Sequence, residues 1–288
     1  MTFRKVLNIV EADEQFRKIS SWRKTPSQAT VQGVWFDISL SPGNPSPIYY
    51  AASPLKATQL KYSIDGGINH GLSVSPKQKV LRKFTTICAT AAISPMPIIL
   101  CDYLLYYPFV DESSNDEQIM DNTITLPRYT DGEGVKIMPV MVAPGSATAN
   151  VQFTCTYTNQ SGISGRVTPL VDLTIEQTVV GTLGSSAKAT SNYGGPFIPL
   201  QSGDTGVRSI ESITFPGVTD VGLLTFVLVK PLAQSQIRSA TGPVELDYFK
   251  DFIQAPVIQD DAFLSFICCP NGTLATVPIH GLIETSWA

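Results

Sequence analysis

The segment "DYLLYYPFVD", residues 102 to 111, places four aromatic residues and two leucines between two aspartates. In a β-strand, successive side chains point to opposite faces. The two faces would then carry Tyr103, Leu105, Tyr107 and Phe109 on one side and Leu104, Tyr106 and Val110 on the other. Neither face is polar, so the segment predicts a central strand that is covered on both sides, by other layers of the chain or by a neighbouring subunit.

The composition of the whole chain favours a β-rich protein. Of its 288 residues only 15% are charged, while glycine and proline number 21 each, so much of the surface has to be built from uncharged polar residues. The formal net charge of -4 argues against a broad nucleic-acid-binding surface, which would need clustered Lys and Arg. No segment is long and apolar enough to predict a membrane span, and no signal peptide is evident, so we expect a protein that is made and kept in a cytoplasm or in something assembled there.

Residues 1 to 30 are predicted to form an N-terminal arm. Phe3, Val6, Leu7 and Val10 recur at helical spacing, and Phe16 and Trp22 follow among basic residues. Because this stretch is short and charged, we expect its apolar side chains to pack on another molecule. A helix that caps the parent domain is the alternative.

Beyond the arm, the pattern predicts antiparallel β-sandwich or jelly-roll-like domains. Residues 31–180 would form a first sandwich-like domain, and residues 196–288 a second β-rich domain. The low-complexity stretch 181–195 would be a linker or a surface loop. One helix is predicted in the first half, over residues 75–92, where Val80, Leu81, Phe84, Ile87 and Cys88 form an apolar stripe.

Residues with catalytic or metal-binding potential are few. The five cysteines have no metal-ligand spacing and are expected to be buried free thiols, and the two histidines, His70 and His280, are expected to be structural. Asp204 lies in "SGDTGV", which contains the Asp-Thr-Gly of aspartic proteases, but Gln201, Ser202 and Gly203 before it indicate a turn. Acidic residues around Glu112 are expected to form a solvated face. We expect no enzyme activity, no cofactor and no metal.

Several segments resemble structural proteins of tailed bacteriophages. They are "GGINHGLSVSP" (66–76), "DYLLYYPFVD" with the following "MDNTITLPRYTDGEGVKIMPV", "FTCTYTNQSGISGRVTP", "SGDTGVRSIESITFPG" and "DDAFLSFICCPNGTL". The resemblance implies a virion component, similar to the cement or decoration proteins on the outside of an icosahedral head. It further implies homotrimers that contact the major capsid protein, no nucleic-acid or membrane partner, and assembly in a host cytoplasm.

Two functional hypotheses follow. The first is a capsid cement protein, whose interface residues would be Phe3, Val6, Leu7, Val10, Phe16, Trp22, Tyr103, Tyr106, Tyr107 and Phe109. The second is a carbohydrate-binding β-sandwich of a tail or fibre, with Trp35, Tyr49, Tyr50 or Tyr193 as stacking residues. A hydrolase would depend on Asp204 alone.

Overall fold

The computed structural model describes residues 17–186, 194–240, 242–252 and 254–287. This part of the chain is mainly β, with three antiparallel sheets and one short α-helix, which confirms the predicted fold class. The elements are β1 (Arg17–Lys24), β2 (Phe36–Asp37), β3 (Gly43–Asn44), β4 (Thr58–Gln59), α2 (Tyr62–Asp65), β5 (Lys79–Cys88), β6 (Met96–Asp111), β7 (Gln118–Ile119), β8 (Lys136–Ala143), β9 (Gln152–Asn159), β10 (Arg166–Val167), β11 (Val171–Asp172), β12 (Val207–Thr214), β13 (Leu223–Ile237), β14 (Val244–Asp247), β15 (Phe263–Cys268) and β16 (Ile279–Trp287).

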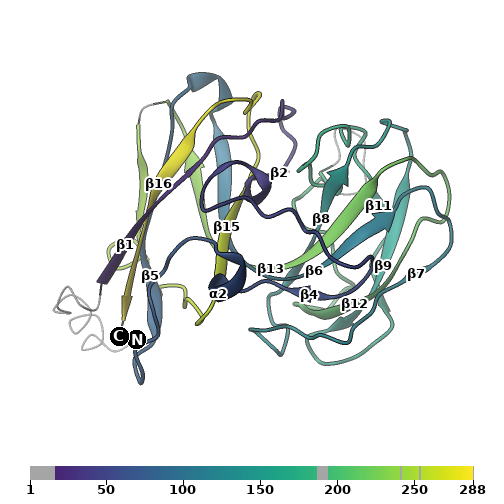
Figure 1. Ribbon diagram of the computed structural model, residues 1–288, viewed down its shortest axis with the longest axis horizontal. Helices are drawn as coiled ribbons and strands as arrows, with labels where there is room; N and C mark the ends of the chain where they lie inside the picture. The colour runs from purple at the N-terminus through teal and green to yellow at the C-terminus, as the bar shows by residue number, and fades with distance from the viewer. Residues whose placement is uncertain (1–16, 187–193, 241, 253, 288) are drawn as a thin grey trace.

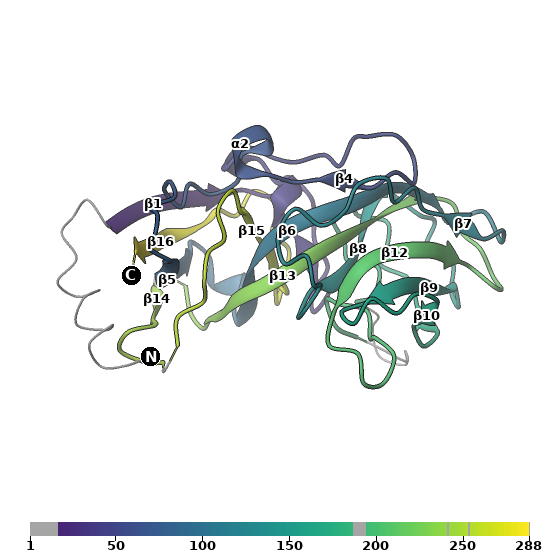
Figure 2. The ribbon, with the colours of Figure 1, turned by 90° about the horizontal axis from the view of Figure 1, so that it is seen from below.

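Two long strands run through the whole molecule. β6 and β13 pair antiparallel from Met96↔Ile237 to Asp111↔Leu223, at the centre of a sheet with the order β2-β15-β6-β13-β8. Figure 1 shows a group of strands on either side of this pair, and Figure 2 shows β6 and β13 passing from one group to the other. The molecule is therefore built as two sandwiches that share one central sheet.

In the first sandwich, the sheet β14-β5-β16-β1-β3 packs against one end of the central sheet. Their shared core includes Trp22 and Phe84 from the outer sheet and Ile98, Leu100 and Phe266 from the central one. Trp22 and Phe266 bring their ring centroids to 4.2 Å, which places the anchor of β1 deep in this core. Aromatic pairs of this kind contribute beyond the apolar area that they bury.

In the second sandwich, the sheet β10-β9-β12-β7 covers the other end of the central sheet. β9 alternates as predicted, with Phe153, Cys155 and Tyr157 buried and the threonines between them half-exposed. Phe153 meets Phe226 of β13 edge to face, at 5.5 Å between ring centroids. This core is separate from that of the first sandwich.

The prediction that residues 102–111 form a central strand is confirmed, but its faces differ from simple alternation. A register shift between Leu228 and Val229 makes Leu104 an extra residue on β6. Leu104 and Leu105 consequently both face the core of the second sandwich, while Tyr103 and Tyr106 face a third apolar cluster on the other side. Segments of residues 34–60 cover that side, so both faces of the strand are buried within the chain.

A buried ion pair lies between the two cores. Asp102 has the same parity on β6 as Leu100, in the first core, and Leu104, in the second. Its carboxylate accepts two hydrogen bonds from Arg128, at 2.9 and 2.7 Å, and one from the Phe263 amide, at 3.0 Å. Burial is the largest influence on Asp102 and raises its pKa to about 6, although Arg128 acts in the opposite direction.

The helix predicted over residues 75–92 is wrong. Lys79–Cys88 forms β5, which pairs with β16 on one side and β14 on the other. Phe84, Thr86 and Cys88 are buried and alternate with half-buried residues, as in a strand. Val80 and Leu81 both reach the first core because a register shift leaves Arg82 without a partner on β16, and Ile87 lies on the outward face. Strand pairing on both sides, together with the β-branched run Thr85, Thr86 and Ile87, overrides the weak helical pattern.

The boundaries of the predicted arm and linker also differ from the structure. Residues 17–24 form β1, which pairs with β16 and buries Trp22 in the core. The part of the predicted arm from Arg17 onward therefore belongs to the first sandwich. Residues 181–186 are buried, and Leu183 forms a bridge to Val140, so this part of the stretch 181–195 is neither a linker nor a surface loop. Each sheet mixes strands from before residue 181 with strands from after residue 195.

Candidate functional site

The aromatic residues of β6 that were predicted at an interface are used inside the chain. The Tyr103 hydroxyl donates to Asp37 Oδ1 at 2.8 Å and contacts the Phe266 carbonyl at 3.1 Å. The Tyr107 hydroxyl donates to Asn122 Oδ1 at 2.7 Å and accepts from the Ile210 amide at 3.1 Å. Tyr106 is buried, and Phe109 is half-buried at a second irregularity of β6, with a φ of 61°. Their burial is explained without a partner.

The predicted interface residues of the arm divide into two groups. Phe3, Val6, Leu7, Val10 and Phe16 lie outside the described residues. Trp22 lies in the core of the first sandwich and exposes only 1% of its surface. It cannot act as a contact for another molecule while β1 is in place.

A buried polar cluster around Asp37 includes Tyr50, one of the residues considered for carbohydrate stacking. Asp37 accepts hydrogen bonds from the hydroxyls of Tyr50, at 2.6 Å, and Tyr103 and from the Ser39 amide. Burial raises the pKa of Asp37, and these bonds act against it. Lys24 lies nearby and donates to the carbonyls of Ser39 and Ser41, at 3.2 and 2.9 Å. Burial lowers the pKa of Lys24 to about 8.

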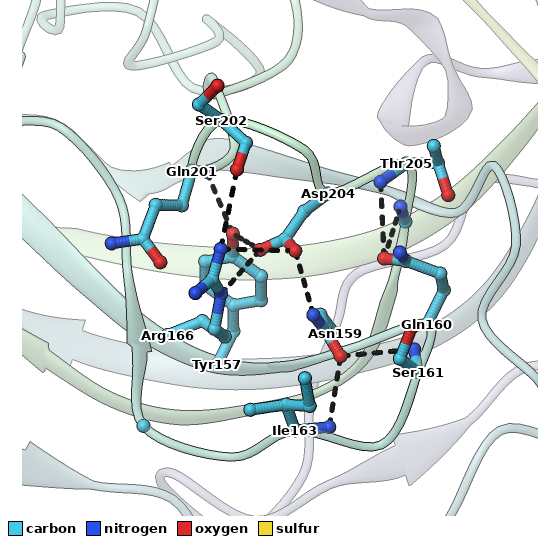
Figure 3. A network of polar contacts seen from close by, with 12 residues as sticks. Tyr157, Asn159, Gln160, Ser161, Ile163, Arg166, Gln201, Ser202, Asp204 and Thr205 are labelled. Carbon is cyan, nitrogen blue, oxygen red and sulfur yellow. Dashed lines mark hydrogen bonds and ion pairs between the residues drawn. The ribbon is translucent and has the colours of Figure 1, made fainter.

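Asp204, the residue of the Asp-Thr-Gly motif, is held in a dense network on the second sandwich (Figure 3). Its carboxylate accepts from Tyr157 Oη at 2.5 Å, Asn159 Nδ2 at 2.7 Å and Arg166 Nε at 2.9 Å. Its own amide donates to the Gln201 carbonyl at 3.0 Å, which confirms the predicted turn. Burial alone would raise the pKa of Asp204, but Arg166, Tyr157 and Asn159 outweigh it, and the pKa is lowered. All these contacts hold the loop 201–204 against β9.

The outward face of the first sandwich has a different character. Ile19 of β1 and Leu282 of β16 are 49% and 45% exposed, and Ile87 of β5 is half-buried beside them. These strands surround a hollow of about 580 Å³, whose lining includes Ser21, Leu282 and Ile87. Outward faces of antiparallel sheets are ordinarily polar, and exposed apolar patches commonly mark interaction sites.

Gly281 explains how the strands around this hollow come so close together. It pairs with Trp22 of β1 and with Thr86 of β5, and it lines the hollow. A Cβ at this position would lie 1.8 Å from the Thr85 carbonyl oxygen, so the approach of β16 to β5 requires glycine.

The charges around the hollow are unevenly distributed. At one end, Glu284 forms ion pairs with Arg17 and Arg82, at 2.8 Å each. At the other end, Arg23 and His280 are adjacent partners on β1 and β16. Arg23 is exposed, and its side chain has no hydrogen bond or ion pair within the described ranges. The face therefore has an ion-paired end around Glu284 and an opposite end where Arg23 has no partner within the described ranges.

The remaining residues considered for carbohydrate stacking are dispersed. Tyr49 is 65% exposed beside a hollow of about 160 Å³ that Ser27, Gln28 and Ser41 also line. Trp35 is half-buried, and Tyr193 lies outside the described residues.

Titratable and sulfur-containing groups elsewhere also have structural surroundings. Four cysteines are buried and Cys269 is half-buried, all as free thiols. His70 is buried, with Nε2 at 3.0 Å from the Ala262 carbonyl, and burial lowers its pKa to about 4. In the described part of the chain, no group of three or more His, Cys, Asp or Glu residues could hold a metal ion. Nor does any described helix have the length and apolarity to cross a membrane.

Glu112 departs from the expected solvated face. It is fully buried at the end of β6, and neither carboxylate oxygen has a hydrogen-bond partner among the described residues. Burial, followed by repulsion from Asp220 and Asp111, raises its pKa to about 8. The sequence carries no signal of this, because the neighbouring residues are polar.

Comparisons with known proteins add little. No family model and no curated protein matches the chain. Among solved structures, the subviral particle of infectious bursal disease virus VP2 aligns with 94% of this chain and 64% of its own, at 8% identity and a TM-score of 0.10. The structure of the Gt strain of the same virus aligns with 93% and 64%, at 10% identity and a TM-score of 0.09. Neither score indicates a shared fold.

Proposed function

We propose that this chain is a structural virion protein, a cement or decoration protein that stabilises the icosahedral head of a tailed bacteriophage. In this proposal it sits on the outside of the capsid as a homotrimer and bridges adjacent major capsid proteins. Two observations support the proposal. One is the sequence resemblance to phage structural proteins, and the other is an exposed apolar face that could bind a neighbouring protein.

The observation that carries the proposal is the outward face of β1, β16 and β5. Ile19 and Leu282 remain about half exposed there, although the chain has buried every aromatic residue of its most apolar strand at least in part. A protein that works by covering surface between neighbours needs such a face, together with sandwiches rigid enough to present it.

The contacts that Asp204 and His70 make within the chain also support a binding role. The side chain of Asp204 is 4% exposed and bonded to Arg166, and the His70 ring is buried beside a backbone carbonyl. Each of these groups stabilises a local turn or strand contact. On the outward face of β1, β16 and β5, the groups that remain open to a partner include Ile19, Leu282 and the guanidinium of Arg23.

Binding of purified protein to empty heads tests the proposal. The variant that lacks residues 1–15 retains β1 and should fold, whereas a deletion through residue 24 would remove Trp22 from the core. We expect this variant and Leu282→Glu each to lower head occupancy at least tenfold. Ile163→Glu is the matched control, because Ile163 is 55% exposed on the second sandwich. Wild-type protein that does not bind heads would refute the proposal.

One observation favours a second candidate, a carbohydrate-binding protein of a tail or fibre. The exposed ring of Tyr49 borders a small hollow with polar side chains, an arrangement that suits stacking on a sugar. A glycan array compares wild-type protein with Tyr49→Ala. Binding that is lost in the variant would support this candidate, and an array without binding would remove it.

A further inference from the structure

We propose that the outward face of β1, β16 and β5 binds the N-terminal segment, residues 1–16, of a second copy of this chain. This inference deepens the proposed function, because it names the surface and the partner through which copies would associate. It rests on the exposed apolar residues of the face, on the position at which the described chain begins, and on the distribution of charge.

The apolar part of the segment matches the size of the face. Phe3, Val6, Leu7 and Val10 recur at the spacing of one helical stripe. A helix over these eight residues would be about 12 Å long. Three adjacent strands span about 10 Å from axis to axis, so such a helix would cross β1, β16 and β5 and cover Ile19, Leu282 and Ile87.

The charges decide between the chain's own segment and that of a neighbour. The segment carries Arg4 and Lys5 near its start and Glu11, Asp13 and Glu14 near its end. Arg17, where the described chain begins, lies at the end of β1 opposite Arg23, about 20 Å away at the usual rise per residue.

If the segment folded back onto its own β1, its acidic residues would stay close to Arg17, which already forms an ion pair with Glu284, a carboxylate shared with Arg82. Its basic residues would then reach the other end of the face and meet Arg23, a like charge. A segment from a second copy can approach in the opposite direction and place its acidic residues beside Arg23 and His280. Because Arg23 has no partner within the described ranges, its charge favours the second copy.

Disulfide cross-linking between differently tagged chains tests the inference in solution, without any capsid. One chain carries Leu7→Cys and the other Leu282→Cys, both in a Cys269→Ser background, since the four other cysteines are buried. We expect the mixture to form a mixed-chain disulfide at least tenfold more abundantly than a mixture of Leu7→Cys with Ile163→Cys. An equal yield with both partners would overturn the inference.

Two further arms separate the alternatives. A single chain with both Leu7→Cys and Leu282→Cys that cross-links only within itself, at every protein concentration, would show that the segment binds its own chain and would overturn the inference. Arg23→Glu should lower the mixed-chain yield severalfold, and combining it with Glu11→Lys, Asp13→Lys and Glu14→Lys should restore it. Failure of this charge exchange to restore the yield would contradict the proposed direction.

The results are distinguishable from a failure of the proposed function. Efficient cross-linking by a protein that does not bind heads would retain this interface and refute the cement role. Head binding without cross-linking would refute this interface and retain the cement role.

Discussion

The outward faces of the two sandwiches differ in what they leave unsatisfied. On the second sandwich, outward residues bond to one another: Thr158 donates to Glu211 at 2.7 Å and Gln152 to Asp172 at 2.5 Å. On the first sandwich, Ile19 and Leu282 are exposed and Arg23 has no partner within the described ranges. The second sandwich also exposes apolar side chains, Ile119 at 69% and Val167 at 42%, so exposure alone does not separate the two faces. The first face is set apart by a hollow of about 580 Å³ that exposed Leu282 lines together with Arg23, a cation without a partner within the described ranges.

The largest expected effect concerns the junction that holds the two sandwiches together. Arg128→Met would leave the buried Asp102 carboxylate unpaired and should lower the free energy of unfolding by about 3–5 kcal/mol. Because Asp102 lies between the two cores, both sandwiches should lose stability in one urea transition. The double variant Arg128→Met/Asp102→Leu should recover much of the loss. Two separate transitions, with only one shifted, would show that the sandwiches are independent.

The second effect is a pH dependence that arises at Glu112. Its pKa of about 8 in the folded protein exceeds the ordinary value of 4.5, so the folded state holds the proton more tightly than the unfolded state. The resulting stability is complete below pH 4.5 and is lost as the pH rises to about 8. We expect a total loss of about 5 kcal/mol, since each pKa unit corresponds to about 1.4 kcal/mol.

Glu112→Gln should remove this part of the pH dependence, because the amide does not ionise. The measurement is the urea midpoint of both proteins from pH 5 to 9, and wild type should fall relative to the variant throughout. Parallel curves would mean that Glu112 is ionised in the folded protein at neutral pH.

A smaller effect is expected from the network that closes the second sandwich. Tyr157→Phe removes the bond to Asp204 and the acceptor of the Gln201 amide, and it should cost about 1–2 kcal/mol. Tyr49→Phe, on an exposed ring, should change unfolding by less than about 0.5 kcal/mol. Equal stability of both variants would show that the network around Asp204 does not hold the loop.

Substitutions on the outward faces of the two sandwiches should have the smallest effect on stability. The two faces should instead differ in how strongly such substitutions weaken association between copies. Leu282→Glu and Thr154→Glu should each change the free energy of unfolding by less than about 0.5 kcal/mol. Association between copies, measured by sedimentation, should weaken in Leu282→Glu and remain as in wild type in Thr154→Glu. Equal weakening in both would remove the distinction between the faces.

The sequence is sufficient to predict the β class, the central strand at 102–111 and the alternation of β9. In these cases, the order of apolar and polar residues directly indicates which strand faces are buried. The sequence is insufficient where the pairing between strands determines the register or the type of secondary structure. The shift at Leu104 depends on the register with β13. The apolar spacing of residues 80–88 fits a helix, and it is accommodated in β5 only through a register shift opposite Arg82, which depends on the pairing with β16. Trp22 was assigned to an arm because its core partner, Phe266, is distant in sequence.

The candidate surface could not be predicted from the sequence either, because it too depends on strand pairing. Ile19 and Leu282 lie on strands from opposite ends of the chain, and only the pairing of β1 with β16 brings them to one face. A single exposed isoleucine or leucine is ordinary, and the patch becomes visible only when the strands are assembled. The predicted arm was expected to pack on another molecule, and the sequence did not indicate the surface that would receive it.

The central claim is that this chain covers apolar surface between neighbours in a shell, and imaging of intact virus particles tests the claim most directly. We predict its density on the outside of the icosahedral head, with the outward face of β1, β16 and β5 against a neighbouring copy. Density confined to the tail, or particles that lack the chain altogether, would contradict the account.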